Sequence, residues 1–354
     1  MATLILEDGT RFEGESFGAE KSSPGEVVFN TGMVGYPESL TDPSYQGQIL
    51  CFTYPLIGNY GVSKMKDEYG FPVQFESEKI HVSGLIVHEF CKEPNHWGSE
   101  ESLHSWLKKE GVPGIAGIDT RALTQKLREH GVMLGFIDAT DNAEPKFLDP
   151  NKRDLVSEVS TLKKVEYDFG GKKTIALIDC GVKYGIIRSL LKRGVKVVRF
   201  PHTASVKEIL SIEPAGIIVS NGPGDPKMCR KIIQTVKDLI DKKPLFGICI
   251  GNQILALAIG ANTYKMKYGH RGQNKPCIDL SSGRCYVTSQ NHGFAVDPET
   301  LPQDFKVSWL NADDKTVEGI ICRNKPVSGV QFHPEASPGP YETGFLFDNF
   351  IKLL

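Results

Sequence analysis

The chain has 354 residues, of which 40% are hydrophobic and 24% are charged, and this length allows two domains that each bury a core. Its 41 basic and 43 acidic residues give a formal net charge of -2, so no global field would recruit nucleic acid or an anionic membrane. No apolar run reaches the ~20 residues of a membrane-spanning helix, and we expect neither nucleic acid nor a membrane among the partners.

The first part of the chain, residues 1–150, predicts a smaller α+β domain. Short strands punctuated by Gly, Pro and Asn come before two helical patterns, with the strands at 3–7, 25–29 and 48–53 and the helices near 101–108 and 120–129. Strands followed by helices are typical of this class. The polar and charged passage at 151–172 is expected to be a linker.

The second part, residues 173–354, predicts an open, mostly parallel sheet with helices on both faces. Near-continuous apolar strands alternate with helices, the strands at 174–179, 196–200, 216–220 and 244–248 and the helices at 184–193 and 230–241. Ligands of such sheets bind beyond the carboxyl ends of the strands. We therefore expect the residues that follow these strands to lie near a site.

The fourth of these strands leads into the pattern Gly247-x-Cys249-x-Gly251, followed by an apolar helix. This is the cysteine form of a nucleophile elbow, in which the glycines allow a sharp turn that lifts the side chain clear of the sheet. The N-terminus of the helix favours a thiolate at this position. A lone cysteine in such a place is also compatible with a small core residue.

A second polar feature, His333-Pro-Glu335, ends a strand in which apolar and polar residues alternate. Residues two apart on a strand point the same way, so both side chains would emerge together if the proline does not turn the chain. The pair then predicts a relay in which Glu335 fixes the tautomer of His333, and His333 takes the proton of Cys249. Cys, His and Glu in this order resemble the class I (triad-type) glutamine amidotransferases.

The loop 220–226, with two glycines around a proline, follows the third strand and is compatible with a plain connector. It also predicts an oxyanion site, because attack on a carboxamide creates a negative oxygen that needs fixed donors. We propose the backbone amides near Gly222 and at Ile250 as these donors. His292 is expected to be structural or exposed, since His333 already has an orienting carboxylate.

The start of the chain and its cysteines predict a cytoplasmic protein without a metal site. Residues 1–8 begin as a strand and lack the basic lead and apolar core of a secretory signal. The eight cysteines form no CxxC or other metal-ligand spacing, and a chain of this length needs no disulfides for stability.

The resemblance narrows to the small, glutaminase subunit of carbamoyl phosphate synthetase. The segments of the second half that carry it are 219–226, 246–251, 289–294 and 331–335. Segments of the first half are similar to the amino-terminal domain peculiar to that family, namely 25–45, 53–61 and 117–124. The stretches 264–274 and 283–291 look closest to the animal-type multifunctional protein of pyrimidine synthesis, in which this unit is fused to the synthetase.

The resemblance implies a class I glutamine amidotransferase-like fold and hydrolysis of L-glutamine to glutamate and ammonia through a thioester at Cys249. His333 would protonate the leaving nitrogen and then activate water, and Glu335 would hold His333. The implied glutamine pocket contains Ser44, which would reach in from the other domain, together with Gly222, Gly224, Ile250, Gln253, Asn291, Gly293 and Phe294.

The resemblance also implies a partner, which is a carbamoyl phosphate synthetase large subunit or fused synthetase domains. That partner would use the ammonia with bicarbonate and ATP to make carbamoyl phosphate for pyrimidine or arginine synthesis. No segment here resembles a phosphate-binding loop. We therefore expect no cofactor in this chain and the ATP chemistry in the partner.

One departure from the family pattern lies at Asn252, where histidine is usual and where ammonia-dependent relatives of the urea cycle often carry asparagine. A neutral amide supplies neither the charge nor the proton of imidazole. Two alternatives stay open at this point. One is a non-catalytic regulatory or scaffold domain of an ammonia-dependent synthetase, and the other is an amidotransferase of another pathway.

Overall fold

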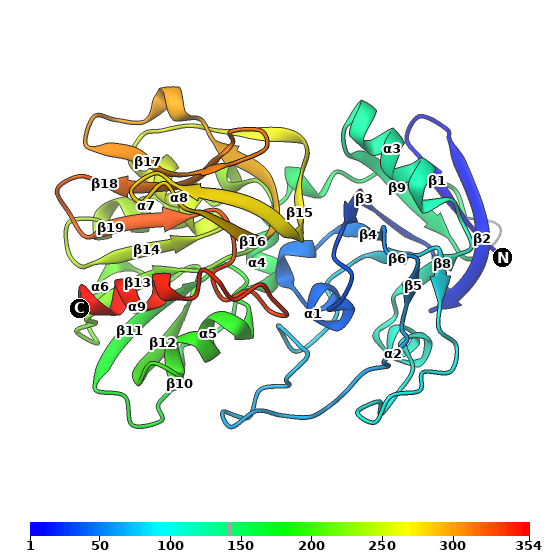
Figure 1. Ribbon diagram of the computed structural model, residues 1–354, viewed down its shortest axis with the longest axis horizontal. Helices are drawn as coiled ribbons and strands as arrows, with labels where there is room; N and C mark the ends of the chain where they lie inside the picture. The colour runs from blue at the N-terminus through cyan, green and yellow to red at the C-terminus, as the bar shows by residue number, and fades with distance from the viewer. Residues whose placement is uncertain (141–142) are drawn as a thin grey trace. The chain divides into compact units, whose positions relative to one another are not determined.

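The computed structural model describes residues 1–140 and 143–354, which form two compact units, 1–153 and 154–354 (Figure 1). The segment predicted to be a linker, 151–172, contains the end of the first unit and also helix α4 (Leu155–Val159) and strand β10 (Val165–Tyr167) of the second. In the part of the chain that is described, no helix is both long and apolar enough to cross a lipid bilayer.

The first unit is built on a closed barrel with the strand order β1-β2-β8-β6-β4-β3-β9. Apolar side chains such as Leu4, Ile49 and Ile115 fill its interior. The strands are β1 Ala2–Leu6, β2 Arg11–Gly18, β3 Ser23–Asn30, β4 Gln48–Phe52, β6 Gly84–Ile86, β8 Pro113–Ala116 and β9 Met133–Asp138, with a separate pair β5 Leu56–Ile57 and β7 Glu89–Phe90. The predicted α+β class is confirmed.

Short helices connect these strands. They are α1 Tyr36–Leu40, α2 Leu103–Glu110 and α3 Thr120–His130, with 3-10 turns at Pro43–Tyr45 and Pro150–Lys152. Helix α3 begins at Asp119, whose side chain accepts a hydrogen bond from the backbone N–H of Ala122 at 2.8 Å. Both helical patterns predicted for this half are present.

The buried His81 in the first unit should make the free energy of unfolding depend on pH. Its ring nitrogens lie 3.0 Å from Gln46 Oε1 and 2.9 Å from Ser77 Oγ, and burial lowers the pKa of His81 to about 4. The unfolded chain takes up this proton near pH 6.5, whereas the folded chain does not. Stability is therefore unaffected above pH 6.5 and falls by roughly 3 kcal/mol as the pH drops from 6.5 to 4.

Urea unfolding of the full chain between pH 7.5 and 5 measures this effect. We expect His81→Gln to flatten the pH dependence in that interval, although it lowers stability at pH 7.5. The exposed His130, changed to glutamine, serves as the matched control and should leave the dependence as it is. An unchanged slope in the His81 variant would assign the acid sensitivity to other groups.

The second unit contains a sheet of strand order β10-β12-β11-β13-β14-β19-β18-β16-β15-β17. The neighbouring strands β12, β11, β13, β14 and β19 are parallel to one another. Antiparallel strands extend the sheet on both sides. The strands are β11 Lys173–Asp179, β12 Val195–Pro201, β13 Gly216–Val219, β14 Leu245–Ile248, β15 Thr263–Asp279, β16 Cys285–Val296, β17 Phe305–Asn311, β18 Val317–Cys322 and β19 Val327–Val330. The predicted open α/β sheet is confirmed, with the parallel part at its centre.

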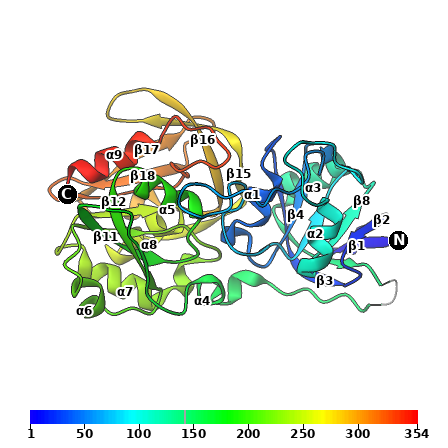
Figure 2. The ribbon, with the colours of Figure 1, turned by 90° about the horizontal axis from the view of Figure 1, so that it is seen from below.

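Helices cover both faces of this sheet (Figure 2). They are α5 Tyr184–Leu191, α6 Val206–Leu210, α7 Arg230–Leu239, α8 Ile250–Ala258 and α9 Phe345–Lys352, with 3-10 turns at Pro226–Met228 and Pro298–Thr300. Helix α7 buries Ile232 and Val236 one turn apart, which gives it one apolar face. On the other face, Phe350 of α9 stacks on Phe246 with ring centroids 5.7 Å apart.

The parallel strands β11, β13, β14 and β19 direct their carboxyl ends to one edge of the sheet. The residues that follow these ends include Lys183, Ser220, Cys249 and His333. The topology thus brings segments that are distant in the sequence to the same edge, as expected for a ligand site in an open α/β sheet.

Candidate active site

Cys249 occupies a strained turn between strand β14 and helix α8, with φ 56° and ψ −110°. A residue other than glycine is held in such a conformation only where its surroundings enforce it. A Cβ atom at Gly251 would lie 2.2 Å from Val219 O, and one at Gly247 would lie 2.5 Å from Gly251 O. Both positions therefore require glycine, and the predicted strand, sharp turn and helix are confirmed.

The Cys249 thiol is buried among polar groups at the start of helix α8. Its Sγ lies 3.6 Å from Asn291 O and 3.7 Å from Gln331 Nε2. The backbone N–H of Cys249 donates to Val330 O at 2.8 Å, which ties the turn to strand β19. The helix N-terminus and the Gln331 amide both place positive charge density near the sulfur.

His333 and Glu335 form a buried pair just beyond strand β19, with His333 Nδ1 2.6 Å from Glu335 Oε1. A carboxylate only accepts, so Nδ1 carries the hydrogen and Nε2 is left for the reacting groups. Burial and the Lys183 ammonium oppose a charged imidazole, but Glu335, with a smaller contribution from the Cys249 side chain, outweighs them and holds the pKa of His333 above its ordinary value. Among the described residues, Nε2 has no hydrogen-bond partner.

Lys183 is a fourth buried group, which the sequence reasoning missed. Its Nζ lies 3.1 Å from Glu335 Oε1 and 3.1 Å from Ala336 O, and the two charged side chains are 4% and 0% exposed. Burial would raise the pKa of Glu335, but the Lys183 ammonium and then His333 outweigh it and hold that pKa well below its usual range. The available signal was a lysine four residues after the strand predicted at 174–179, whose carboxyl end was expected at the site.

Residues predicted to line the glutamine pocket surround the thiol. Gln253 Nε2 donates to Phe294 O at 2.8 Å and to Gln331 Oε1 at 3.0 Å. Asn291, next to the thiol, and Gly293 lie on strand β16 with Phe294, and a Cβ atom at Gly293 would lie 3.2 Å from the Arg271 guanidinium. The structure thus brings these residues together with Cys249, and their contact with glutamine stays a prediction.

The proposed oxyanion donors lie at the same edge. Gly222 packs so tightly that a Cβ atom there would lie 2.0 Å from Cys180 O, and Gly224 has φ +85° beside Leu155. Ile250 is the first residue of α8, where backbone N–H groups lack acceptors within the helix. The role of the Gly222 and Ile250 amides stays a prediction.

Ser44 lies in the first unit, in the 3-10 turn Pro43–Tyr45, and its backbone N–H donates to Asp42 Oδ1 at 2.8 Å. Ser44 is 6% exposed. Its participation in a glutamine pocket is a prediction that rests on the resemblance alone.

Asn252, the departure from the family pattern, is fully buried on helix α8 and packs against Gly329 of strand β19. A Cβ atom at Gly329 would lie 2.6 Å from Asn252 Oδ1, so the glycine makes room for this side chain. Among the described residues, neither polar atom of the Asn252 amide has a hydrogen-bond partner. The asparagine therefore fills space under the sheet and does not bind the triad.

Two family models match the chain. Residues 4–137 match the carbamoyl-phosphate synthase small chain, CPSase domain, and residues 176–353 match glutamine amidotransferase class-I. The first match lies within the unit 1–153, and the second lies within the unit 154–354.

Curated relatives agree with these models. The chain is 53% identical to the multifunctional protein CAD of Squalus acanthias, over 99% of this chain but only 16% of that protein. It is 50% identical to the carbamoyl phosphate synthase arginine-specific small chain of Saccharomyces cerevisiae, over 99% of this chain and 88% of that protein. It is 48% identical to the carbamoyl phosphate synthase small chain of Pyrococcus furiosus, over 99% of this chain and 97% of that protein. From the agreement of both halves with one kind of subunit, we conclude that the chain belongs to the carbamoyl phosphate synthase small-chain family.

Proposed function

We propose that this chain hydrolyses L-glutamine to glutamate and ammonia and supplies the ammonia to a carbamoyl phosphate synthetase. The observation that carries the proposal is the buried His333–Glu335 pair beside the strained turn of Cys249. This arrangement presents a nucleophile, a base and an orienting carboxylate, which acyl transfer from an amide requires.

In the first half of the reaction, the Cys249 sulfur attacks the side-chain amide carbon of glutamine while His333 Nε2 holds the thiol proton. The carbonyl oxygen becomes an oxyanion, to which the amides of Ile250 and Gly222 donate. Collapse of the tetrahedral species breaks the C–N bond, and His333 gives its proton to the leaving nitrogen. Ammonia departs and a γ-glutamyl thioester remains on Cys249.

In the second half, His333 takes a proton from water, and the resulting hydroxide attacks the thioester carbon. The C–S bond breaks, glutamate leaves, and the proton returns to the sulfur. Glu335 accepts the Nδ1 hydrogen bond throughout and stabilises the imidazolium that forms in each half. Lys183 keeps that carboxylate ionised.

The same proposal includes a synthetase partner, either a separate large subunit or fused domains. The names of the relatives support it, since they include both a small chain and a multifunctional protein. In this proposal the partner binds ATP and bicarbonate and makes carbamoyl phosphate for pyrimidine or arginine synthesis. A cytoplasmic location is supported by the cysteines, all of which are free thiols in the structure.

Partner dependence gives the test of the function. We expect the chain alone to hydrolyse glutamine slowly, and a large subunit with ATP and bicarbonate to raise kcat at least about tenfold, which corresponds to about 1.4 kcal/mol of activation free energy. The measurement is glutamate release with and without each component. A full rate in isolation that no synthetase changes would contradict the coupling.

The alternatives predict different results in the same assay. A regulatory or scaffold domain would bind the synthetase but would release no glutamate, and a glutamine analogue that alkylates thiols would leave Cys249 unmodified. An amidotransferase of another pathway would hydrolyse glutamine but would not form a complex with a carbamoyl phosphate synthetase.

A further inference from the structure

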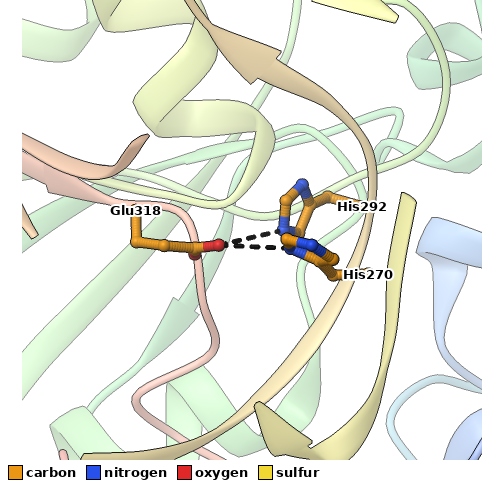
Figure 3. A group of neighbouring side chains, drawn as sticks. All are labelled: His270, His292 and Glu318. Atoms are coloured by element: carbon orange, nitrogen blue, oxygen red, sulfur yellow. Dashed lines mark hydrogen bonds and ion pairs between the residues drawn. The ribbon is translucent and has the colours of Figure 1, made fainter. Parts of the chain in front are cut away.

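A second buried polar cluster lies in the antiparallel part of the second unit, on three different strands. It consists of His270 on β15, His292 on β16 and Glu318 on β18, and the Glu318 carboxylate points at both imidazoles (Figure 3). Glu318 Oε1 lies 3.3 Å from His270 Nδ1 and 3.7 Å from His292 Nε2. The three potential ligand atoms all lie within 4.8 Å of one another.

The hydrogen bonds on the far side of each ring decide where the hydrogens of neutral imidazoles lie. His270 Nε2 is 2.9 Å from Asp314 Oδ2, and His292 Nδ1 is 2.8 Å from Phe294 O. Carboxylates and carbonyls only accept, so these two nitrogens carry the hydrogens. The nitrogens that face Glu318 then present lone pairs, and three acceptor atoms converge on one point.

The surroundings leave this convergence of acceptors largely uncompensated. Gln290 adds another acceptor, because its Oε1 is 3.2 Å from His292 Nε2 while its amide nitrogen faces Cys277 and Thr288. Asn311 Nδ2 is a donor, but it lies 3.5 Å from both His270 Nδ1 and Glu318 Oε1, which is long for a hydrogen bond. Glu318 is 0% exposed, and its Oε2 has no hydrogen-bond partner among the described residues.

We propose that His270 Nδ1, His292 Nε2 and the Glu318 carboxylate bind a Zn²⁺ ion. Two imidazoles and a carboxylate are a common zinc ligand set, and tetrahedral bonds of this kind place ligand atoms about 3.3 Å apart, close to the 3.3 and 3.7 Å found here. Histidines that bind zinc typically donate their other N–H to a carboxylate or a backbone carbonyl, as His270 does to Asp314 and His292 to Phe294.

The expectation of no metal site rested on the spacing of cysteines along the chain. The spacing of His270, His292 and Glu318 is not diagnostic of a metal site, because only the pairing of the strands brings them together. Asp314, whose side chain contacts His270, is 45% exposed, whereas the side chains of His270 and Glu318 are 7% and 0% exposed. The ion would link β15, β16 and β18 behind the active site. Asn291 of β16 contacts the Cys249 thiol, and Glu318 O accepts from the backbone N–H of Gln331 at 2.8 Å.

Zinc titration of the full chain tests the proposal. Chelator-treated protein carrying Cys249→Ser, which removes the active-site thiol as a rival ligand, is titrated with ZnCl₂ against a chromophoric chelator. We expect one ion per chain with a Kd at or below about 1 μM, which corresponds to about −8 kcal/mol. His270→Asn and Glu318→Gln should each weaken binding at least about a hundredfold, and Asp314→Asn about tenfold.

A matched control and a spectroscopic measurement separate this site from adventitious binding. The exposed His130, changed to asparagine, should leave the Kd unchanged. Co²⁺ in place of Zn²⁺ should give visible d–d bands of a tetrahedral ion without a thiolate charge-transfer band. ZnCl₂ should also raise the unfolding midpoint of the parent but not of the His270→Asn variant.

Three results would overturn the proposal. The first is that the parent binds no zinc in stoichiometric amount, in which case protons on the histidines hold the cluster together. The second is that binding persists in both ligand variants, and the third is that cobalt shows a thiolate band; either result would place the ion elsewhere. Because the first titration leaves all three proposed ligands in place, poor folding of Glu318→Gln would not affect the conclusion, and His270→Asn provides a second ligand variant.

Discussion

Replacing Cys249 with serine is expected to lower kcat for glutamine hydrolysis at least about a thousandfold without unfolding the chain. A hydroxyl ionises far less readily than a thiol, so His333 can no longer generate a strong nucleophile. The sulfur has weak hydrogen bonds at 3.6 and 3.7 Å, and serine has nearly the same shape as cysteine, so the substitution leaves the strained backbone as it is. Initial rates of glutamate release and the thermal unfolding midpoint measure the two parts of this prediction.

Cys285→Ser is the matched control, because Cys285 is the exposed cysteine of the described residues and lies at the start of β16. It should retain the rate of the parent. If Cys249→Ser kept its activity, the thioester would have to form elsewhere. If it lost activity together with its thermal transition, the substitution would be reporting on folding.

Replacing Lys183 with methionine is expected to lower the free energy of unfolding by about 3–5 kcal/mol and to slow glutamine hydrolysis as well. The two charges are almost completely removed from water, at 4% and 0% exposure, so the substitution leaves an uncompensated carboxylate in the interior. Denaturant unfolding and steady-state kinetics of the full chain provide the measurement.

The pH dependence of this variant follows from the electrostatics. Lys183 is the foremost group that lowers the pKa of Glu335, so its loss raises that pKa. The catalytic form has an ionised Glu335, and the acid limb of kcat/KM should therefore move to higher pH. The sign is fixed, because a carboxyl that protonates more easily is lost to the reaction at a higher pH.

A double substitution separates charge from shape. Adding Glu335→Gln to Lys183→Met removes both charges and should restore much of the lost stability, while activity stays low because His333 has lost its carboxylate. The exposed Lys207, changed to methionine, should alter neither property. A Lys183→Met variant as stable and as active as the parent would contradict the proposed role of this lysine.

Local patterns account for the parts of the site that could be predicted from the sequence. The turn at Cys249 depends on glycines within two residues of it, and the strand that leads to His333 shows its own alternation. Contacts between distant segments were not predictable in the same way. The approach of Lys183 to Glu335 depends on strands β11 and β19 ending at the same edge of the sheet, and the place of the lysine in the sequence indicates that edge but not its partner.

The fold shows the same division. Helix α3 has a local cap at Asp119 and an apolar face, and both can be recognised in the sequence. Closure of the first unit into a barrel depends on the pairing of β1 with β9, which joins the two ends of that unit. The grouping of His270, His292 and Glu318 is likewise a property of the sheet, since each residue alone looks like an ordinary member of a strand.

The positive φ of Cys249 implies a trade-off between thermal stability and reactivity at this position. Glycine adopts that backbone conformation without the strain of about 1–3 kcal/mol that a side chain brings. A change of Cys249 to glycine would therefore relax the backbone but remove the nucleophile, so stability and the proposed reaction favour different residues at this position.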